Sequence, residues 1–138
     1  MTKYVITDPC YITSEEVWDE CLKDFSNFSK QISEHLTQVT GEPAYACDTG
    51  FGDWSNGLIS KDGYVGAFGA DSGMVCVCKV TDDIEDKLGS IFGACYCIFE
   101  AEGPLDVVFD TSDKSWTVVY IEDVTGNEWQ SLTLDDEE

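Results

Sequence analysis

The spacing of apolar residues changes at Pro43, and this change constrains the fold more than any other feature of the sequence. Before Pro43, apolar residues recur every three or four positions, which is the period of an amphipathic helix. They are Val17, Cys21, Phe25, Phe28, Ile32, Leu36 and Val39. After Pro43 they fall in short runs of β-branched and aromatic residues, which are typical of strands. The chain therefore predicts an α+β fold.

The N-terminal part predicts one long helix. Thr13 or Ser14 can cap its beginning, and Glu16 follows Thr13 at the spacing of a capping box. Gly41 can end it in a left-handed conformation. Ser26-Asn27 is a pair of weak helix formers near the middle, so a break into two helices is the alternative.

The remaining chain predicts a mostly antiparallel sheet of about six to eight strands, because short polar turns connect most neighbouring runs. The expected strands are 3–7, 44–47, 64–68, 74–80, 91–100, 105–109, 116–122 and 129–134. Residues 91–134 are expected to form a meander, and 81–89 a short second helix. We expect the long helix to pack on this sheet in a single domain, 1–134, followed by an acidic tail, 135–138.

The charge of the chain excludes several classes of partner. The net charge is −21, with 28 acidic residues, seven lysines and no arginine. Such a surface repels nucleic acid and anionic membranes and attracts basic proteins. We therefore expect a basic protein partner, one that itself binds nucleic acid. The odd number of cysteines, seven, and the absence of a signal-peptide pattern predict a protein of the cytoplasm.

Acidic residues gather in the two expected helices. The predicted partner-binding residues are Glu15, Glu16, Asp19, Glu20, Asp24, Asp82, Asp83, Glu85 and Asp86. Like charges four residues apart on a helix cost about 0.2–0.5 kcal/mol per pair. A surface that tolerates this repulsion fits a basic partner, and its carboxylates can imitate the phosphates of a nucleic acid. The alternative is an acidic surface that serves only solubility.

A second candidate site lies in a glycine-rich stretch. Seven of the 12 glycines lie between Cys47 and Cys78, which indicates tight turns and close backbone packing. Asp53 and Asp71 stand in these turns, and Asp8 ends the first strand. Converging carboxylates could hold a divalent cation or act in acid–base chemistry. The alternative is that each aspartate bonds its own turn. The ligand site so defined comprises Asp8, Cys10, Tyr11, Asp53, Trp54 and Asp71.

Two Cys-x-Cys pairs suggest a third, weaker site. Cys76 and Cys78 lie in one expected strand, and Cys95 and Cys97 in another, so each pair would present both thiols on one face. If the strands were neighbours, four sulfurs could surround a zinc ion. Cysteine is more often a small buried apolar residue, and we expect no metal and no cofactor.

The opening segment, YVITDPCYI from Tyr4 to Ile12, resembles the start of a group of uncharacterised small phage and bacterial proteins. These proteins begin with a strand, an Asp-Pro-Cys-Tyr motif and a helix with an early tryptophan, here Trp18. Later Gly-Asp and Asp-Ser-Gly turns are also similar, although the group usually has Gly-Asp-Gly where this chain has Gly52-Asp53-Trp54. The resemblance covers about the first 80 residues. It implies a phage-type protein directed at a host system.

Three functions follow as hypotheses. The first is a non-enzymatic inhibitor of a basic, nucleic-acid-handling host defence protein, acting by nucleic-acid mimicry. The second is a small-molecule or metal-binding domain, with hydrolytic activity as one form, built on the Asp-Pro-Cys-Tyr and Gly-Asp turns. The third is a virion or assembly component held by a sheet edge.

Overall fold

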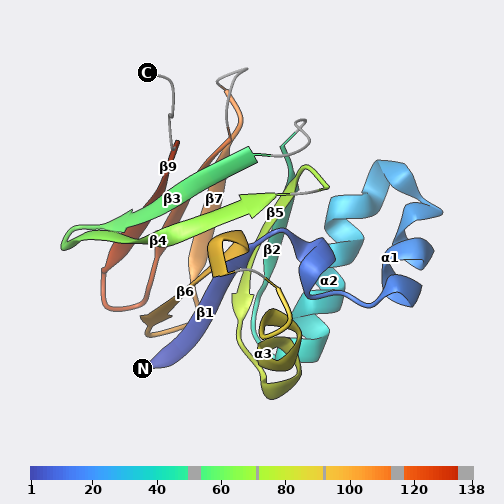
Figure 1. The fold of residues 1–138 in the computed structure, drawn as a ribbon, viewed down its shortest axis with the longest axis horizontal. Helices are drawn as coiled ribbons and strands as arrows, with labels where there is room; N and C mark the ends of the chain where they lie inside the picture. Colours follow the sequence, from blue (N-terminus) through green and yellow to red (C-terminus); the bar gives the residue numbers. More distant parts are fainter. Residues whose placement is uncertain (50–53, 71, 92, 113–116, 134–138) are drawn as a thin grey trace.

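The computed structural model describes residues 1–49, 54–70, 72–91, 93–112 and 117–133. These residues form three layers, with helices on one side, a four-stranded sheet in the middle and a five-stranded sheet on the other side (Figure 1). The α+β class is therefore confirmed, with two sheets in place of the single one expected.

Both sheets are antiparallel throughout their paired strands. The four-stranded sheet has the order β2 (Tyr45–Asp48), β5 (Met74–Lys79), β1 (Thr2–Thr7) and β6 (Tyr96–Ala101). The five-stranded sheet has the order β4 (Gly63–Ala70), β3 (Trp54–Ser60), β9 (Glu128–Thr133), β8 (Val118–Glu122) and β7 (Asp106–Asp110).

The prediction of one long N-terminal helix is wrong, because the segment divides into two helices. These are α1 (Glu15–Leu22) and α2 (Phe28–Thr40), separated by the 3-10 turn η2 (Phe25–Asn27). The break falls where the side chain of Asp24 accepts hydrogen bonds from Ser26 and Asn27. Short polar side chains that bond locally compete with the helix in this way. Ser14 caps α1, and Gly41 ends α2 in the left-handed conformation.

The remaining helical elements are short. The 3-10 turn η1 (Pro9–Tyr11) follows β1 directly, and η3 (Gly93–Cys95) precedes β6. The predicted second helix is confirmed as α3 (Asp82–Leu88), which Thr81 caps through its side chain. No helix in the part of the chain that the structure describes is long and apolar enough to cross a membrane.

The middle sheet is buried on both faces. Along β1, Val5 points into the core beneath the helices, whereas Tyr4 and Ile6 point into the core between the two sheets. All three side chains are at most 1% exposed. The alternation of a strand therefore supplies apolar side chains to two separate cores.

The strand predictions contain two errors with different causes, and the first is that neighbours in the sequence are not always neighbours in space. The meander is confirmed for β7, β8 and β9, but β6 lies in the other sheet, paired with β1. The strand β3 was not predicted, because Asn56 and Gly57 interrupt its apolar pattern.

The chain crosses from one sheet to the other after β6, and Asp123 holds this crossing. Its carboxylate accepts hydrogen bonds from the backbone N–H of Glu102 (3.0 Å), Thr125 (3.0 Å) and Asn127 (3.0 Å) and from the Thr125 hydroxyl (2.7 Å). Glu102 follows β6 of one sheet and Asp123 follows β8 of the other, so this carboxylate ties the two sheets together.

Candidate functional site

The nine predicted partner-binding carboxylates form one feature, which we call the acidic helix surface. All nine side chains are exposed on α1, α3 and the turn after α1. Both helices lie on the same side of the middle sheet, because Cys21 of α1 and Ile84 and Leu88 of α3 belong to one core, which α1 joins by packing against α2 (Figure 1). The two clusters therefore share one layer of the molecule.

Lysines offset little of this charge in the described residues. The ion pairs are Lys23–Glu20 at 3.1 Å, Lys87–Asp83 at 2.8 Å and Lys3–Glu85 at 3.8 Å. Exposed pairs of this kind contribute about 0–1 kcal/mol each. The other carboxylates of the acidic helix surface have no lysine within 4.0 Å in the part of the chain that is described.

Asp24 also has a local structural role. Its carboxylate accepts hydrogen bonds from Asn27 (2.9 Å) and Ser26 (3.1 Å), and these bonds lower its pKa, the Asn27 bond most. It remains a fully ionised member of the surface at neutral pH and fixes the turn between α1 and α2.

A second surface is the outer face of the five-stranded sheet, which the sequence had not indicated. The register places Val108, Tyr120, Gln130 and Ile59 side by side on four neighbouring strands, and Tyr64 extends this row onto the fifth strand. Tyr64 is 61% exposed, Val108 55% and Tyr120 41%. We call these five residues the apolar row, although Gln130 in its middle is polar. Large side chains that stand this far out of a sheet are unusual when they lie next to one another.

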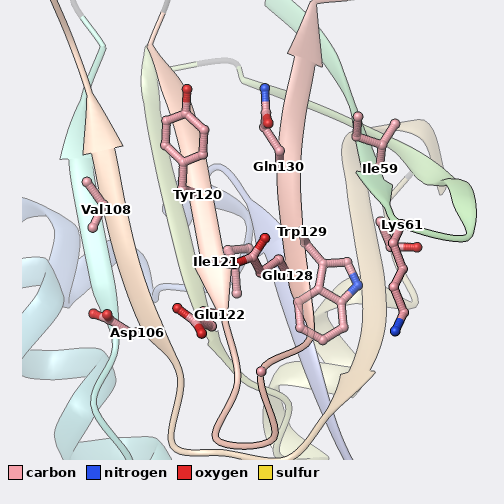
Figure 2. A pocket seen from close by; sticks show the side chains of 12 residues that line it. Ile59, Lys61, Asp106, Val108, Tyr120, Ile121, Glu122, Glu128, Trp129 and Gln130 are labelled. Carbon is pink, nitrogen blue, oxygen red and sulfur yellow. The ribbon is translucent and has the colours of Figure 1, made fainter.

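Three carboxylates lie beside the apolar row, two residues further along the strands. Asp106 pairs with Glu122, and Glu122 pairs with Glu128, so they form an acidic row across β7, β8 and β9. The acidic row and all members of the apolar row except Tyr64 line one hollow with a volume of about 420 Å³ (Figure 2). Lys61 lines the opposite edge of the hollow, after β3.

Asp8, from the predicted ligand site, is buried and fully engaged with protein donors. Its exposure is 0%, and its carboxylate accepts hydrogen bonds from the backbone N–H of Cys10 (2.9 Å) and Ser72 (2.6 Å) and from the Ser72 hydroxyl (2.8 Å). The carboxylate therefore caps η1 and ties the end of β1 to the turn before β5. These bonds fit the alternative expectation for Asp8, in which the aspartate has a structural role in its turn.

The other members of the predicted ligand site are only partly described. Asp53 and Asp71 lie outside the described residues, as does the side chain of Trp54. The backbone of Trp54 pairs with Ala70, which precedes Asp71. Cys10 is half-buried in η1. Tyr11 lines a second hollow of about 440 Å³ with Gly89, Ser90, Ile91 and Cys95.

The structure separates the Cys-x-Cys pairs, so the four-sulfur site is not formed. β1 lies between β5 and β6, and Cys76 and Cys78 point into the core beneath the helices, whereas Cys97 points into the core between the sheets. Cys95 lies in η3, before the strand. Among the described residues no group of three potential ligands could hold a metal ion.

Burial also raises the pKa of two of these thiols, those of Cys76 and Cys97, and keeps them protonated at neutral pH. It raises the pKa of Cys97 to about 11, and it raises the pKa of Cys76 well above the usual range, with a further contribution from the hydrogen bond to Cys78. A thiol in this state is a poor metal ligand and a poor nucleophile. Cys76, Cys78 and Cys97 therefore act as small apolar core residues.

One signal for the outer sheet face was present in the sequence. In β7 and β8 buried and exposed positions alternate, yet Val108 and Tyr120 occupy exposed positions where polar residues are usual. Strand patterns alone do not tell which of two apolar faces is covered, so this signal does not identify the exposed face.

Comparison of the chain with family models, with curated proteins and with solved structures found no match.

Proposed function

We propose that this chain is a non-enzymatic binding protein that docks on a basic, nucleic-acid-handling protein through the acidic helix surface. By occupying the surface that receives phosphates, it inhibits that protein. If the chain is phage-encoded, as the resemblance of its N-terminal segment implies, the target is a protein of the host.

The observation that carries this proposal is the exposure of all nine carboxylates on one layer, with only three lysine partners among the described residues. Side chains needed for folding are normally buried or paired, whereas all nine are exposed, and most of them have no lysine partner among the described residues. A net charge of −21 steers a cationic protein toward this layer and accelerates association at low salt.

The test compares two variants that lose the same charge. The first neutralises three carboxylates of α1, in the substitutions Glu15→Gln, Glu16→Gln and Asp19→Asn. The matched control neutralises three carboxylates outside the helical layer, in the substitutions Asp62→Asn, Glu100→Gln and Glu102→Gln. Immobilised wild type and both variants are incubated with a bacterial lysate cleared of nucleic acid, and the captured proteins are quantified by mass spectrometry over a salt series.

We expect wild type to capture nucleic-acid-binding proteins at low salt and the α1 variant to lose about 3- to 10-fold of that capture, while the control retains it. Duplex DNA should displace the captured proteins. Equal losses for both variants would show that total charge, and no particular surface, governs capture. If no nucleic-acid-binding protein is enriched at low salt, the proposal is wrong, and if DNA fails to displace the partner, mimicry is wrong.

A further inference from the structure

The outer face of the five-stranded sheet has no covering layer in the described part of the chain. Its inner face packs on the middle sheet, whereas Val108, Tyr120 and Tyr64 stand exposed on the outer face. A sheet that exposes apolar side chains on one face usually buries that face against a helix or another sheet. Among the described residues this face is therefore open to another molecule.

The charges around the apolar row identify the kind of molecule. Asp106, Glu122 and Glu128 are direct cross-strand neighbours, and like charges in that arrangement destabilise a sheet. None of the three has a lysine within 4.0 Å among the described residues. Cationic side chains placed over this acidic row would remove the repulsion, so the occupant is basic next to its apolar contact.

A second copy of the chain does not meet this requirement. Each copy carries a net charge of −21, and pairing of the two faces would bring two acidic rows into one interface. Nucleic acids and anionic lipids are repelled for the same reason. A basic polypeptide segment remains.

The dimensions of the two rows favour a helix as that segment. The part of the apolar row from Val108 to Ile59 crosses four strands, which is about 14 Å at the usual strand spacing. That length corresponds to roughly ten helical residues. The acidic row lies about 7 Å to one side, because it is two residues further along each strand. A helix of 10–12 Å diameter that lies on the apolar row therefore brings one flank over the acidic row.

We propose that the outer face of the five-stranded sheet binds a basic amphipathic helix of a partner protein. Its apolar stripe packs on Val108, Tyr120 and Ile59, and lysine or arginine side chains along one flank pair with Asp106, Glu122 and Glu128 (Figure 2). This surface is separate from the acidic helix surface, and the proposal does not depend on the function suggested for that layer.

Synthetic peptides test this proposal without knowledge of the natural partner. The probe is a leucine–lysine peptide of about 15–18 residues, long enough to form a helix when bound, with lysines along one flank of its leucine stripe. One control peptide has the same composition in shuffled order, and another carries glutamate in place of lysine. Affinities are measured by isothermal titration calorimetry at low and at physiological salt.

Three protein variants locate the binding site. The apolar variant is Val108→Thr with Tyr120→Thr, which places a residue of high strand propensity at both exposed positions. The charge variant is Asp106→Asn with Glu122→Gln, and its charge-matched control is Asp62→Asn with Glu100→Gln. Circular dichroism and urea unfolding confirm that each variant is folded.

We expect the lysine peptide to bind wild type and the control variant with equal affinity. The apolar variant should bind at least about tenfold more weakly, and the charge variant about three- to tenfold more weakly with a smaller salt dependence. Binding of the shuffled peptide with equal affinity, or binding of the lysine peptide unaffected by both outer-face variants, would overturn the proposal. Dimerisation of wild type that the apolar variant abolishes would also overturn it, in favour of a second copy as the occupant.

Discussion

Substitution of Asp123 by asparagine should weaken the junction of the two sheets by an amount that depends on pH. Asp123 is 5% exposed. Burial by itself raises the pKa of this carboxyl, but hydrogen bonds from Glu102, Thr125 and Asn127 outweigh it and lower the pKa to about 2. In the unfolded chain the pKa is about 3.9. The ionised form is therefore the one that the folded protein binds more tightly.

The size of the effect follows from this difference. A shift of nearly two pKa units corresponds to about 2.5 kcal/mol of folding free energy at neutral pH. The same figure follows from the contacts. In Asp123→Asn the amide oxygen can still accept the hydrogen bonds that Asp123 Oδ1 accepts, such as the one from the Thr125 N–H. The NH₂ group, however, replaces Oδ2, so the backbone N–H of Glu102 faces another donor and loses its acceptor. A buried N–H without an acceptor costs about 1–3 kcal/mol. We expect a loss of about 2 kcal/mol at pH 7.

The pH dependence is the sharper part of this prediction. Because the folded pKa lies below the unfolded one, the stabilisation by Asp123 is complete above about pH 5 and is lost as the pH falls toward 2. The difference in unfolding free energy between wild type and Asp123→Asn should therefore shrink from about 2 kcal/mol at pH 7 to near zero at about pH 2. Urea unfolding at a series of pH values measures it.

The matched control is Glu100→Gln, which removes one exposed carboxylate from β6. Its effect on the free energy of unfolding should stay within about 0.5 kcal/mol at every pH, as is usual for surface substitutions. A difference for Asp123→Asn that does not change between pH 7 and pH 2 would refute the reasoning, because a pH-independent loss cannot come from the charge of this carboxylate.

Three further predictions concern close packing and thiol reactivity. Gly103→Ala should lower the free energy of unfolding, measured by urea denaturation, by about 2–4 kcal/mol. A Cβ at this position overlaps the Tyr4 hydroxyl and breaks the 2.6 Å hydrogen bond that this hydroxyl donates to Glu42. Gly66→Ala should cost about 1–2 kcal/mol, because its Cβ would lie 2.9 Å from Cys97 Sγ, and Cys97→Ala in the same chain should recover part of that loss. In native protein at neutral pH, the 0% exposed thiol of Cys76 should be alkylated only as fast as the protein unfolds, as followed by mass spectrometry.

Each of these predictions has an internal control. Gly93→Ala adds a methyl group with nothing within 4 Å, so it should not reproduce the effect of Gly103→Ala. If Gly66→Ala remains equally destabilising when Cys97 is alanine, the contact with its sulfur is not the cause. Half-buried Cys95 provides the comparison for alkylation, and equal rates for Cys95 and Cys76 would contradict the burial argument.

The sequence predicted those elements whose pattern is set locally. The helical period before Pro43 and the meander of the last three strands depend on neighbours a few residues away, and both appear in the structure. The break between α1 and α2 depends on side-chain bonds from Asp24 to Ser26 and Asn27, and it was foreseen only as an alternative.

The division into two sheets could not be predicted, because it depends on pairing between distant segments. The continuous apolar runs Tyr4-Val5-Ile6 and Met74 to Cys78 hinted at it, since a strand that is apolar at successive positions is buried on both faces. The acidic helix surface was identified because exposed charge can be read from composition and period. The apolar row was missed, because its members come from separate strands and meet only through the register of the sheet.

The position of β1 also determines when the protein can fold during synthesis. Thr2 lies opposite Ala101, and β1 stands between β5 and β6 in the middle sheet. One edge of β1 pairs with β6, which lies nearly a hundred residues further along the chain. This strand therefore leaves the ribosome long after β1. Until then one edge of β1, with its row of unpaired backbone groups, stays open to other chains. The middle sheet is completed only after β6 has been made, and the net charge of −21 opposes association between chains until then.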